Sequence, residues 1–262
     1  MSIWTVIILG IVEGLTEFLP VSSTGHLILA GYVLNFTGEE ATSFEIVIQL
    51  GAILSVVVYF RRQLWELLRQ LPRDRISQRL AFALAVAFIP AAILGLVLHK
   101  WIEQYLFGPV TVAWALIVGG VVILVVEHTI KSRQIQGLNQ IDARRAWWVG
   151  MAQCFSLFPG VSRSGATIIG GLLTGLDRTT ATEFSFLLAI PTMLAATGYK
   201  IVKTHDLLLQ ADPLLLPLGL AVAFITGLAV VAGFLAFVRS HTFKSFAYYR
   251  IVLGVIILAV MR

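Results

Sequence analysis

Two glutamates stand four residues apart in a strongly apolar stretch near the start of the chain, at Glu13 and Glu17. Residues four apart in a helix lie on one face, so the two carboxylates point the same way. One alternative is a structural pair, with one carboxyl protonated and the other bonded to the backbone. We favour a functional pair, because carboxylates at membrane depth usually line a cavity. Paired carboxylate oxygens suit a hard divalent cation such as Mg²⁺ or Ca²⁺.

A cluster of hydroxyl residues follows the acids and ends on a histidine, at residues 22–26. Imidazole can transfer protons or act as a nucleophile near neutral pH, so His26 is a candidate catalytic group. Ser23 is the competing nucleophile, with Glu17 as its base. The two candidates are three residues apart and can share a helix face. We slightly prefer His26, because a neutral imidazole needs no base, and a metal-activated water is the third route.

The segment 159–167 has the composition of an anion site. Gly160 and Gly165 permit unusual dihedrals and a close approach of the backbone. A helix is predicted to start here, and free N–H groups at a helix start attract anions. Arg163 adds a planar fork that binds phosphate through two parallel bonds. Further donors are supplied by Ser162, Ser164 and Thr167. The structural alternative is a capped helix start whose arginine reaches the membrane surface.

These two motifs occupy equivalent positions in an internal repeat, because residues of the first recur 140 positions later without a gap. The matched residues of the first copy are Gly10, Phe18, Val21, Ser22, Gly25, Ile28 and Gly31. The copies differ at their polar positions: acids and a histidine mark the first, and an arginine marks the second. The repeat therefore predicts one composite site between two halves, residues 1–140 and 141–262.

The composition is that of an integral membrane protein. Of the 262 residues, 58% are hydrophobic and 13% are charged, against about 45–50% and about 25% in soluble domains. The net charge of +5 lies mostly in short loops between apolar runs, so it reports topology and does not indicate nucleic acid. A single cysteine, Cys154, excludes an internal disulfide.

The apolar runs predict an all-α fold with six membrane spans, at about 44–60, 80–98, 110–126, 184–199, 214–238 and 246–261. The segments 3–34 and 147–175 are apolar but interrupted by Pro, Gly and Ser, and we interpret both as re-entrant helix hairpins. Each half then holds one hairpin and three spans, so the second half is inverted relative to the first. Inverted repeats with broken helices place their sites near the midplane, where the halves meet.

Basic loops set the predicted orientation. They follow the first, third and fifth spans, and contain Arg61, Arg62, Arg69, Arg73, Arg75, Arg79, Lys131, Arg133, Arg144, Arg145, Arg239 and Lys244. Placing these loops in the cytoplasm satisfies the positive-inside rule. Both termini, the entry of the first hairpin and the opening of the active site are then predicted to lie on the outer side of the membrane.

Both motifs closely resemble the signatures of the bacterial undecaprenyl-pyrophosphate phosphatases of the bacitracin-resistance type. The matching segments are 13–26 and 159–167, and the resemblance extends over essentially the whole chain. It implies a divalent-cation-dependent enzyme that converts undecaprenyl pyrophosphate to the monophosphate lipid carrier of cell-wall synthesis. The expected location is the inner (plasma) membrane of a bacterium, with a polyprenyl pyrophosphate lipid as substrate and a second copy of the chain as partner in a homodimer.

The resemblance also implies roles for individual residues. Glu13 and Glu17 become metal or catalytic acids, and Ser23 and His26 become catalytic. The spacing of Ser23 and His26 itself leads us to predict a two-step reaction through a phospho-enzyme. The implied pyrophosphate ligands are Ser162, Arg163, Ser164 and Thr167. Two other classes remain open from the residues alone. A transporter or lipid flippase uses the same inverted repeats, and a binder of the lipid head group needs only the anion site. Phosphate release by purified protein separates the enzyme from both.

Overall fold

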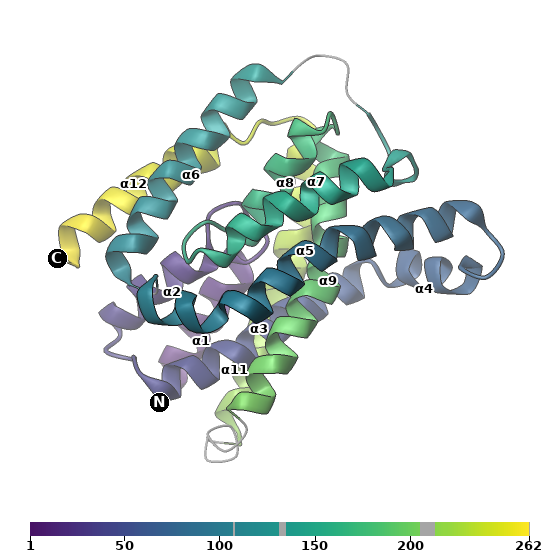
Figure 1. Cartoon of the computed structure of the whole chain (residues 1–262). Helices are drawn as coiled ribbons and strands as arrows, with labels where there is room; N and C mark the ends of the chain where they lie inside the picture. The colour runs from purple at the N-terminus through teal and green to yellow at the C-terminus, as the bar shows by residue number, and fades with distance from the viewer. Residues whose placement is uncertain (107, 131–134, 205–212, 262) are drawn as a thin grey trace.

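The apolar runs fold into helices throughout the computed structural model (Figure 1), which describes residues 1–106, 108–130, 135–204 and 213–261. The long helices are α3 (Glu39–Tyr59), α5 (Arg75–Tyr105), α6 (Pro109–Thr129), α9 (Arg178–Lys203), α11 (Leu215–Val238) and α12 (Lys244–Val260). The shorter ones are α1 (Ile3–Thr16), α2 (Ser23–Val33), α4 (Arg61–Gln70), α7 (Ala143–Cys154) and α8 (Arg163–Leu173). The described ranges contain no strand beyond an isolated bridge between Ile135 and Leu176. The predicted all-helical class is confirmed.

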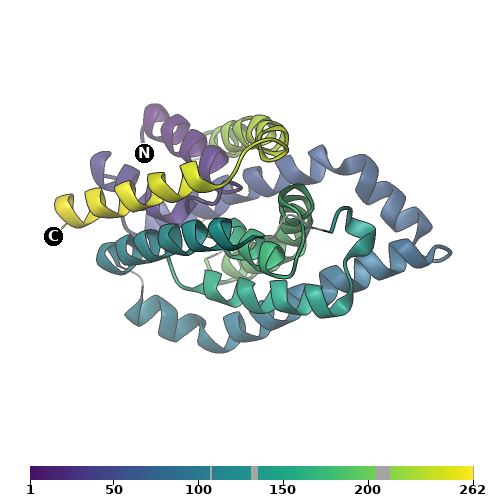
Figure 2. The same cartoon turned by 90° about the horizontal axis from the view of Figure 1, so that it is seen from above.

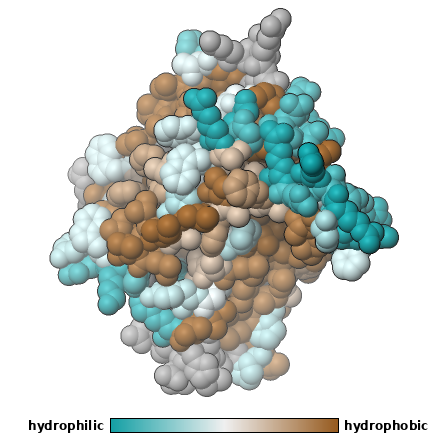
Figure 3. Space-filling view, turned by 45° about the vertical axis from the view of Figure 1, so that its right-hand side comes forward, coloured by the Kyte–Doolittle hydropathy of each residue, from teal (hydrophilic) through white to brown (hydrophobic). Residues whose placement is uncertain are grey.

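Four helices are long and apolar enough to cross a membrane on their own: α5, α6, α9 and α11. A fifth span results if α3 and α4, which meet at a bend of 67°, are taken together. Helix α12 has 17 residues, which is the lower limit for a span. Apolar side chains cover much of the face in Figure 3, with hydrophilic ones gathered toward its upper and right-hand parts. The chain is therefore a multi-pass membrane protein.

Two of the spans extend well past the predicted apolar runs. Helix α5, with 31 residues, begins at Arg75 because Asp74 caps it, and the Asp74 carboxylate accepts the backbone N–H of Ser77 at 2.8 Å. Helix α9 has 26 residues because Asp177 caps it by accepting the N–H of Thr180 at 2.8 Å. Caps and polar first turns set these ends, and a count of apolar residues does not include them.

The two interrupted segments share one backbone design. The first helix of each, α1 or α7, ends before the break, and the second helix, α2 or α8, begins after a serine with positive φ. Ser22 has φ 69° and accepts the N–H of Gly25 at 3.5 Å. Ser162, 140 residues later, has φ 76° and accepts the N–H of Gly165 at 3.1 Å. Non-glycine residues rarely adopt this conformation, so its recurrence shows that the repeat extends to the backbone.

Helices of one half pack mainly against helices of the other. Helices α1 and α3 lie on α11, α5 lies on α7, and α6 runs beside α12 (Figures 1 and 2). Glycines allow the closest approaches: a Cβ on Gly10 would lie 3.1 Å from the Gly219 carbonyl oxygen of α11, and one on Gly150 would lie 2.6 Å from the Ala87 carbonyl oxygen of α5. Gly10 and Gly150 are repeat equivalents, so each half packs closely against the other through a glycine at the same repeat position.

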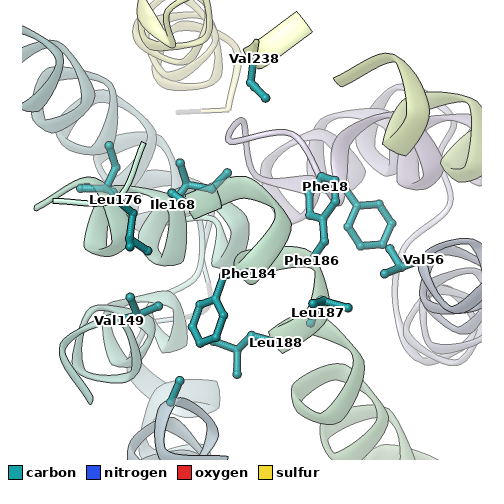
Figure 4. Close-up of a cluster of buried hydrophobic side chains, with 14 of the residues drawn as sticks. Phe18, Val56, Val149, Ile168, Leu176, Phe184, Phe186, Leu187, Leu188 and Val238 are labelled. Carbon is teal, nitrogen blue, oxygen red and sulfur yellow. The ribbon is translucent and has the colours of Figure 1, made fainter. Parts of the chain in front are cut away.

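A buried apolar cluster supports both breaks (Figure 4). Phe18, in the first break, meets Phe186 of α9 edge to face with ring centroids 5.4 Å apart. Ile168 and Leu176 lie in the same cluster, at and just after the second broken segment. The cluster joins residues from both halves, so it fixes the two breaks relative to each other.

Candidate active site

The two breaks and helices α3 and α9 enclose a cavity of about 220 Å³. Its polar wall is formed by Glu17, Ser22, Ser23, Thr24, Gln49, Ser156, Ser162, Arg163 and Thr192. The breaks also touch directly, because the Ser164 hydroxyl donates to the carbonyl oxygen of Leu19 at 2.8 Å. The acid-bearing break and the arginine-bearing break therefore share one chamber, as the repeat predicted.

Glu17 connects the reactive groups of both halves. The hydroxyl of Ser23 donates to Glu17 Oε2 at 2.5 Å. The other carboxylate oxygen, Oε1, lies 3.5 Å from Arg163 Nη2. A serine hydroxyl bonded to a carboxylate has the geometry of a nucleophile with its base, and the nearby guanidinium supplies the positive charge that an incoming phosphate needs.

Arg163 is held in place but keeps a donor unused. Its Nη1 donates to the carbonyl oxygen of Ser185 at 3.1 Å, and its guanidinium lies 5.8 Å from the ring centroid of Phe18. Its Nε is buried and has no hydrogen-bond partner among the described residues. Burying an unpaired donor is costly, so this atom is suited to an anion that enters the cavity.

Glu13 lies beyond Ser23, at a second and smaller cavity of about 90 Å³. Its side chain is 1% exposed, and within the described residues neither carboxylate oxygen has a hydrogen-bond partner. Glu45, Gln49 and Lys200 line the same cavity. Ser23, Thr24 and Gln49 line both cavities, so the two chambers are neighbours with Ser23 between them.

The Glu13 oxygens bear on the predicted cation. Two free carboxylate oxygens are ligands that a hard cation accepts. In the part of the chain that the structure describes, no group of three or more His, Cys, Asp or Glu side chains is arranged to hold a metal ion. The donor set therefore fits the usual coordination of Mg²⁺ in proteins, in which one or two carboxylates bind the ion and substrate phosphates and water complete its coordination.

His26 lies outside both cavities. Its Nδ1 is 2.7 Å from the carbonyl oxygen of Ser22, and its Nε2 is 2.7 Å from the Tyr249 hydroxyl. Its ring stacks on the Tyr249 ring at an interplanar angle of 8°. With both ring nitrogens engaged, the geometry favours Ser23 over His26 as the attacking group, contrary to the slight preference drawn from the sequence.

The remaining predicted anion ligands divide into two groups. Gly160 and Ser162 line the larger cavity. Ser164, Gly165 and Thr167 do not, because they lie behind the wall: the Thr167 hydroxyl is 2.6 Å from the Ser185 hydroxyl and donates to the Arg163 carbonyl oxygen at 2.9 Å. In this arrangement the second group shapes the turn that presents Arg163.

Three polar residues inside the predicted spans belong to the site or support it, although the motifs do not include them. Gln49 and Thr192 face the larger cavity from α3 and α9. Arg250 lies in α12 and bonds to the backbone of both breaks. Each interrupts an apolar run, and an intramembrane polar residue is a sign of function. That signal was present for Arg250, which the motif analysis passed over.

Comparison with known proteins agrees with this geometry. The sequence model of the family described as bacitracin resistance protein BacA matches residues 6–256. An undecaprenyl-diphosphatase of Caldanaerobacter subterraneus subsp. tengcongensis is 50% identical over 252 residues, covering 96% of this chain and 93% of the relative. The undecaprenyl-diphosphatase of Ectopseudomonas mendocina is 49% identical over 262 residues, covering 99% and 95%. That of Laribacter hongkongensis is 51% identical over 254 residues, covering 96% and 92%.

Proposed function

Because the chain belongs to the bacitracin resistance protein BacA family, we propose that it hydrolyses undecaprenyl pyrophosphate to undecaprenyl phosphate and inorganic phosphate. This reaction regenerates the lipid carrier of cell-wall synthesis and gives bacitracin resistance. The observation that carries the proposal is the contact of Ser23 with Glu17, 2.5 Å, with Arg163 beside the same carboxylate at 3.5 Å. A candidate nucleophile, its base and a guanidinium that can bind phosphate thus line one cavity.

The first chemical step is a transfer of the terminal phosphoryl group to Ser23. The hydroxyl oxygen attacks the terminal phosphorus while Glu17 takes its proton, and the bond from that phosphorus to the bridging oxygen breaks. Undecaprenyl phosphate leaves, and phosphoserine remains. Glu17 then passes this proton to the departing undecaprenyl phosphate or to solvent and is a carboxylate again. In the second step Glu17 deprotonates a water molecule, whose oxygen attacks the phosphorus of phosphoserine. The bond from that phosphorus to the Ser23 oxygen breaks, Glu17 returns the proton to this oxygen, and inorganic phosphate leaves.

Positioning and charge supply most of the catalysis in phosphoryl transfer. Arg163 is placed to neutralise oxygens of the transferring group, and the start of α8 adds the partial positive charge of a helix N-terminus. Gly160 lets the second break pack closely on α6, because a Cβ at its φ of 94° would be strained and would lie 2.7 Å from the Val112 carbonyl oxygen. Ser162 sets the turn by capping α8.

A divalent cation, Mg²⁺ or Ca²⁺, is part of the proposal. Glu13, with its two unpartnered oxygens, and Glu17 would hold it. When bound, such an ion would offset the negative charge of the pyrophosphate. Glu17 would then have two roles, as the base for Ser23 and as a ligand of the ion.

The proposed membrane arrangement has six spans and two re-entrant hairpins in halves of opposite orientation. The matching serine caps at residues 22 and 162 support it, as does the packing of α1 on α11 and of α7 on α5. The lipid tail would stay in the bilayer while the head group enters the cavity. Lys131, Ser132 and Arg133, in the second basic loop, lie outside the described residues.

The proposed orientation predicts which loops are accessible from outside. In a Cys154→Ala background, Ser2→Cys should react with a membrane-impermeant maleimide in intact spheroplasts, because the basic loops hold the opposite side in the cytoplasm. Ser240→Cys, in the exposed turn after α11, should react only after permeabilisation. Labelling of Ser240→Cys but not of Ser2→Cys in intact cells would reverse the topology.

Phosphate release tests the proposed function directly. Purified protein in detergent, given a polyprenyl pyrophosphate, should release one phosphate per lipid when Mg²⁺ or Ca²⁺ is added and should stop when a chelator is added. The broken, repeated segments of this chain also fit a lipid-phosphate carrier. Movement of labelled lipid across sealed liposomes without phosphate release would replace the enzyme by that carrier.

A further inference from the structure

Arg250 is the largest fully buried side chain in the part of the chain that the structure describes, with 1% of its surface exposed. It comes from α12, which runs beside α6 (Figures 1 and 2). Among the described residues it has no carboxylate partner within ion-pair distance. A buried charge is expensive unless its donors are satisfied, so the groups that Arg250 does bind explain why it is there.

All of its hydrogen-bond partners among the described residues are backbone carbonyl oxygens, and they come from three segments. Nη1 donates to Pro20 at 3.2 Å, in the first break. Nη2 donates to Gly160 at 3.2 Å, in the second break. Helix α6 supplies two more acceptors, Ala115 at 3.1 Å from Nη2 and Leu116 at 3.3 Å from Nε.

The two loop acceptors occupy equivalent positions in the repeat, because Pro20 and Gly160 are 140 residues apart. Each lies two residues before the serine with positive φ. At offsets of 140 and 136 the equivalent of Arg250 itself is Val110 or Trp114. One arginine therefore serves both loops, and the repeat supplies no second one.

We propose that Arg250 is a positioning residue that locks the two loops in register, so that Ser23 and Arg163 face each other across the cavity. Peptide units are planar, so holding the Pro20 and Gly160 carbonyls fixes the chain direction into the next residues. Those residues lead to Ser22 and Ser162, and then to the first turns of α2 and α8. Arg250 does not line the cavity, so it acts through the loops.

Gly119 provides an independent way to disturb this side chain. It lies on α6, and a Cβ there would overlap the Arg250 guanidinium. Gly119→Ala therefore displaces the guanidinium while leaving its charge in the protein. Gly233 in α11 is a matched control, because nothing lies within 4 Å of a Cβ built there.

The catalytic consequence rests on the proposed function and is measured by single-turnover hydrolysis of a polyprenyl pyrophosphate with enzyme in excess. The rate constant reports the chemistry of folded molecules, and the amplitude reports how many are folded. Arg250→Met should lower the rate constant by about 100-fold, as expected when reacting groups move by about 1 Å. Arg250→Lys and Gly119→Ala should lower it less, and Gly233→Ala should leave it unchanged. The enzyme concentration for half-saturation should stay within about twofold of the parent's, because Arg250 does not touch the substrate cavity.

Arg178→Met is the structural control, because Arg178 binds Glu127 at 3.0 Å through Nε and ties α9 to α6 away from the loops. It should lower the amplitude or the melting temperature and leave the rate constant unchanged. If Arg250→Lys and Gly119→Ala also change only the amplitude, the positioning role is wrong.

Hydrogen exchange tests the loop coupling without any activity. Arg250→Met or Gly119→Ala should speed amide exchange in segments 18–25 and 158–165 together, whereas Arg178→Met should not. Unchanged exchange in both segments would overturn the coupling even if the enzyme is active. A parent protein that releases no phosphate would reject the proposed function, while joint acceleration in the two segments would still support the coupling.

Discussion

Replacing Ser23 with alanine should lower phosphate release by roughly 1,000-fold or more, because it removes the proposed nucleophile. The Ser23 hydroxyl is the group that bonds to Glu17, at 2.5 Å, and it lies between the two cavities. Initial rates on a polyprenyl pyrophosphate, at matched amounts of folded protein, measure the effect. Ser55→Ala is the control, because the Ser55 hydroxyl is buried, bonds to the Ala52 carbonyl oxygen at 2.6 Å and lines neither cavity.

His26→Gln separates the two candidate nucleophiles. Since both ring nitrogens of His26 are engaged, with Ser22 and Tyr249, we expect a loss of about tenfold or less, comparable to the loss of one supporting hydrogen bond. Tyr249→Phe removes the hydroxyl that meets Nε2 and should have a similar effect. A Ser23→Ala enzyme that keeps near-normal turnover, together with an inactive His26→Gln enzyme, would reverse the assignment.

The second large effect is expected from Arg163→Lys, which should reduce turnover by about 100-fold although the charge is kept. Lysine is a point charge on a flexible stem and cannot make the two parallel bonds of a guanidinium with phosphate. It also lacks the Nε donor, which in Arg163 is buried and has no partner among the described residues. Steady-state rates across a range of substrate concentrations provide the measurement.

Arg145→Lys controls for the chemical change itself. Arg145 pairs with Asp142 at the start of α7 and lines neither cavity, so its replacement should leave turnover within about twofold, as expected for a partly exposed ion pair outside the site. If Arg163→Lys behaves like Arg145→Lys, Arg163 does not bind the transferring phosphate.

Much of the site was predictable because polar residues in an apolar chain need a reason to be there. The acids, the hydroxyl cluster and the arginine stood out against their surroundings, and the repeat placed them at equivalent breaks. Ser22 and Ser162, which the repeat pairs, each cap the helix that follows the break. The class of fold followed from composition, because a chain this apolar can satisfy its backbone in a bilayer as helices.

Other features depend on contacts between residues far apart in the chain. The motif alone does not show that the Thr167 hydroxyl turns toward Ser185, or that Tyr249 meets His26 across 223 residues. Local spacing places Ser23 and His26 on one helix face, but the two side chains have different partners. Ser23 bonds to Glu17 at the cavity, whereas His26 contacts Tyr249 of α12. The starts of α5 and α9 were missed because capping aspartates set them, outside the apolar runs.

In the proposed mechanism, Ser23 carries the phosphoryl group during turnover. Rapid quench of the enzyme with substrate labelled in its terminal phosphate tests it, followed by peptide mapping of the labelled protein. We predict a transient label on Ser23 that survives acid and is lost in base, as phosphoserine is. Label on His26, stable in base and lost in acid, would contradict the account, and so would turnover with no protein-bound label at any time point.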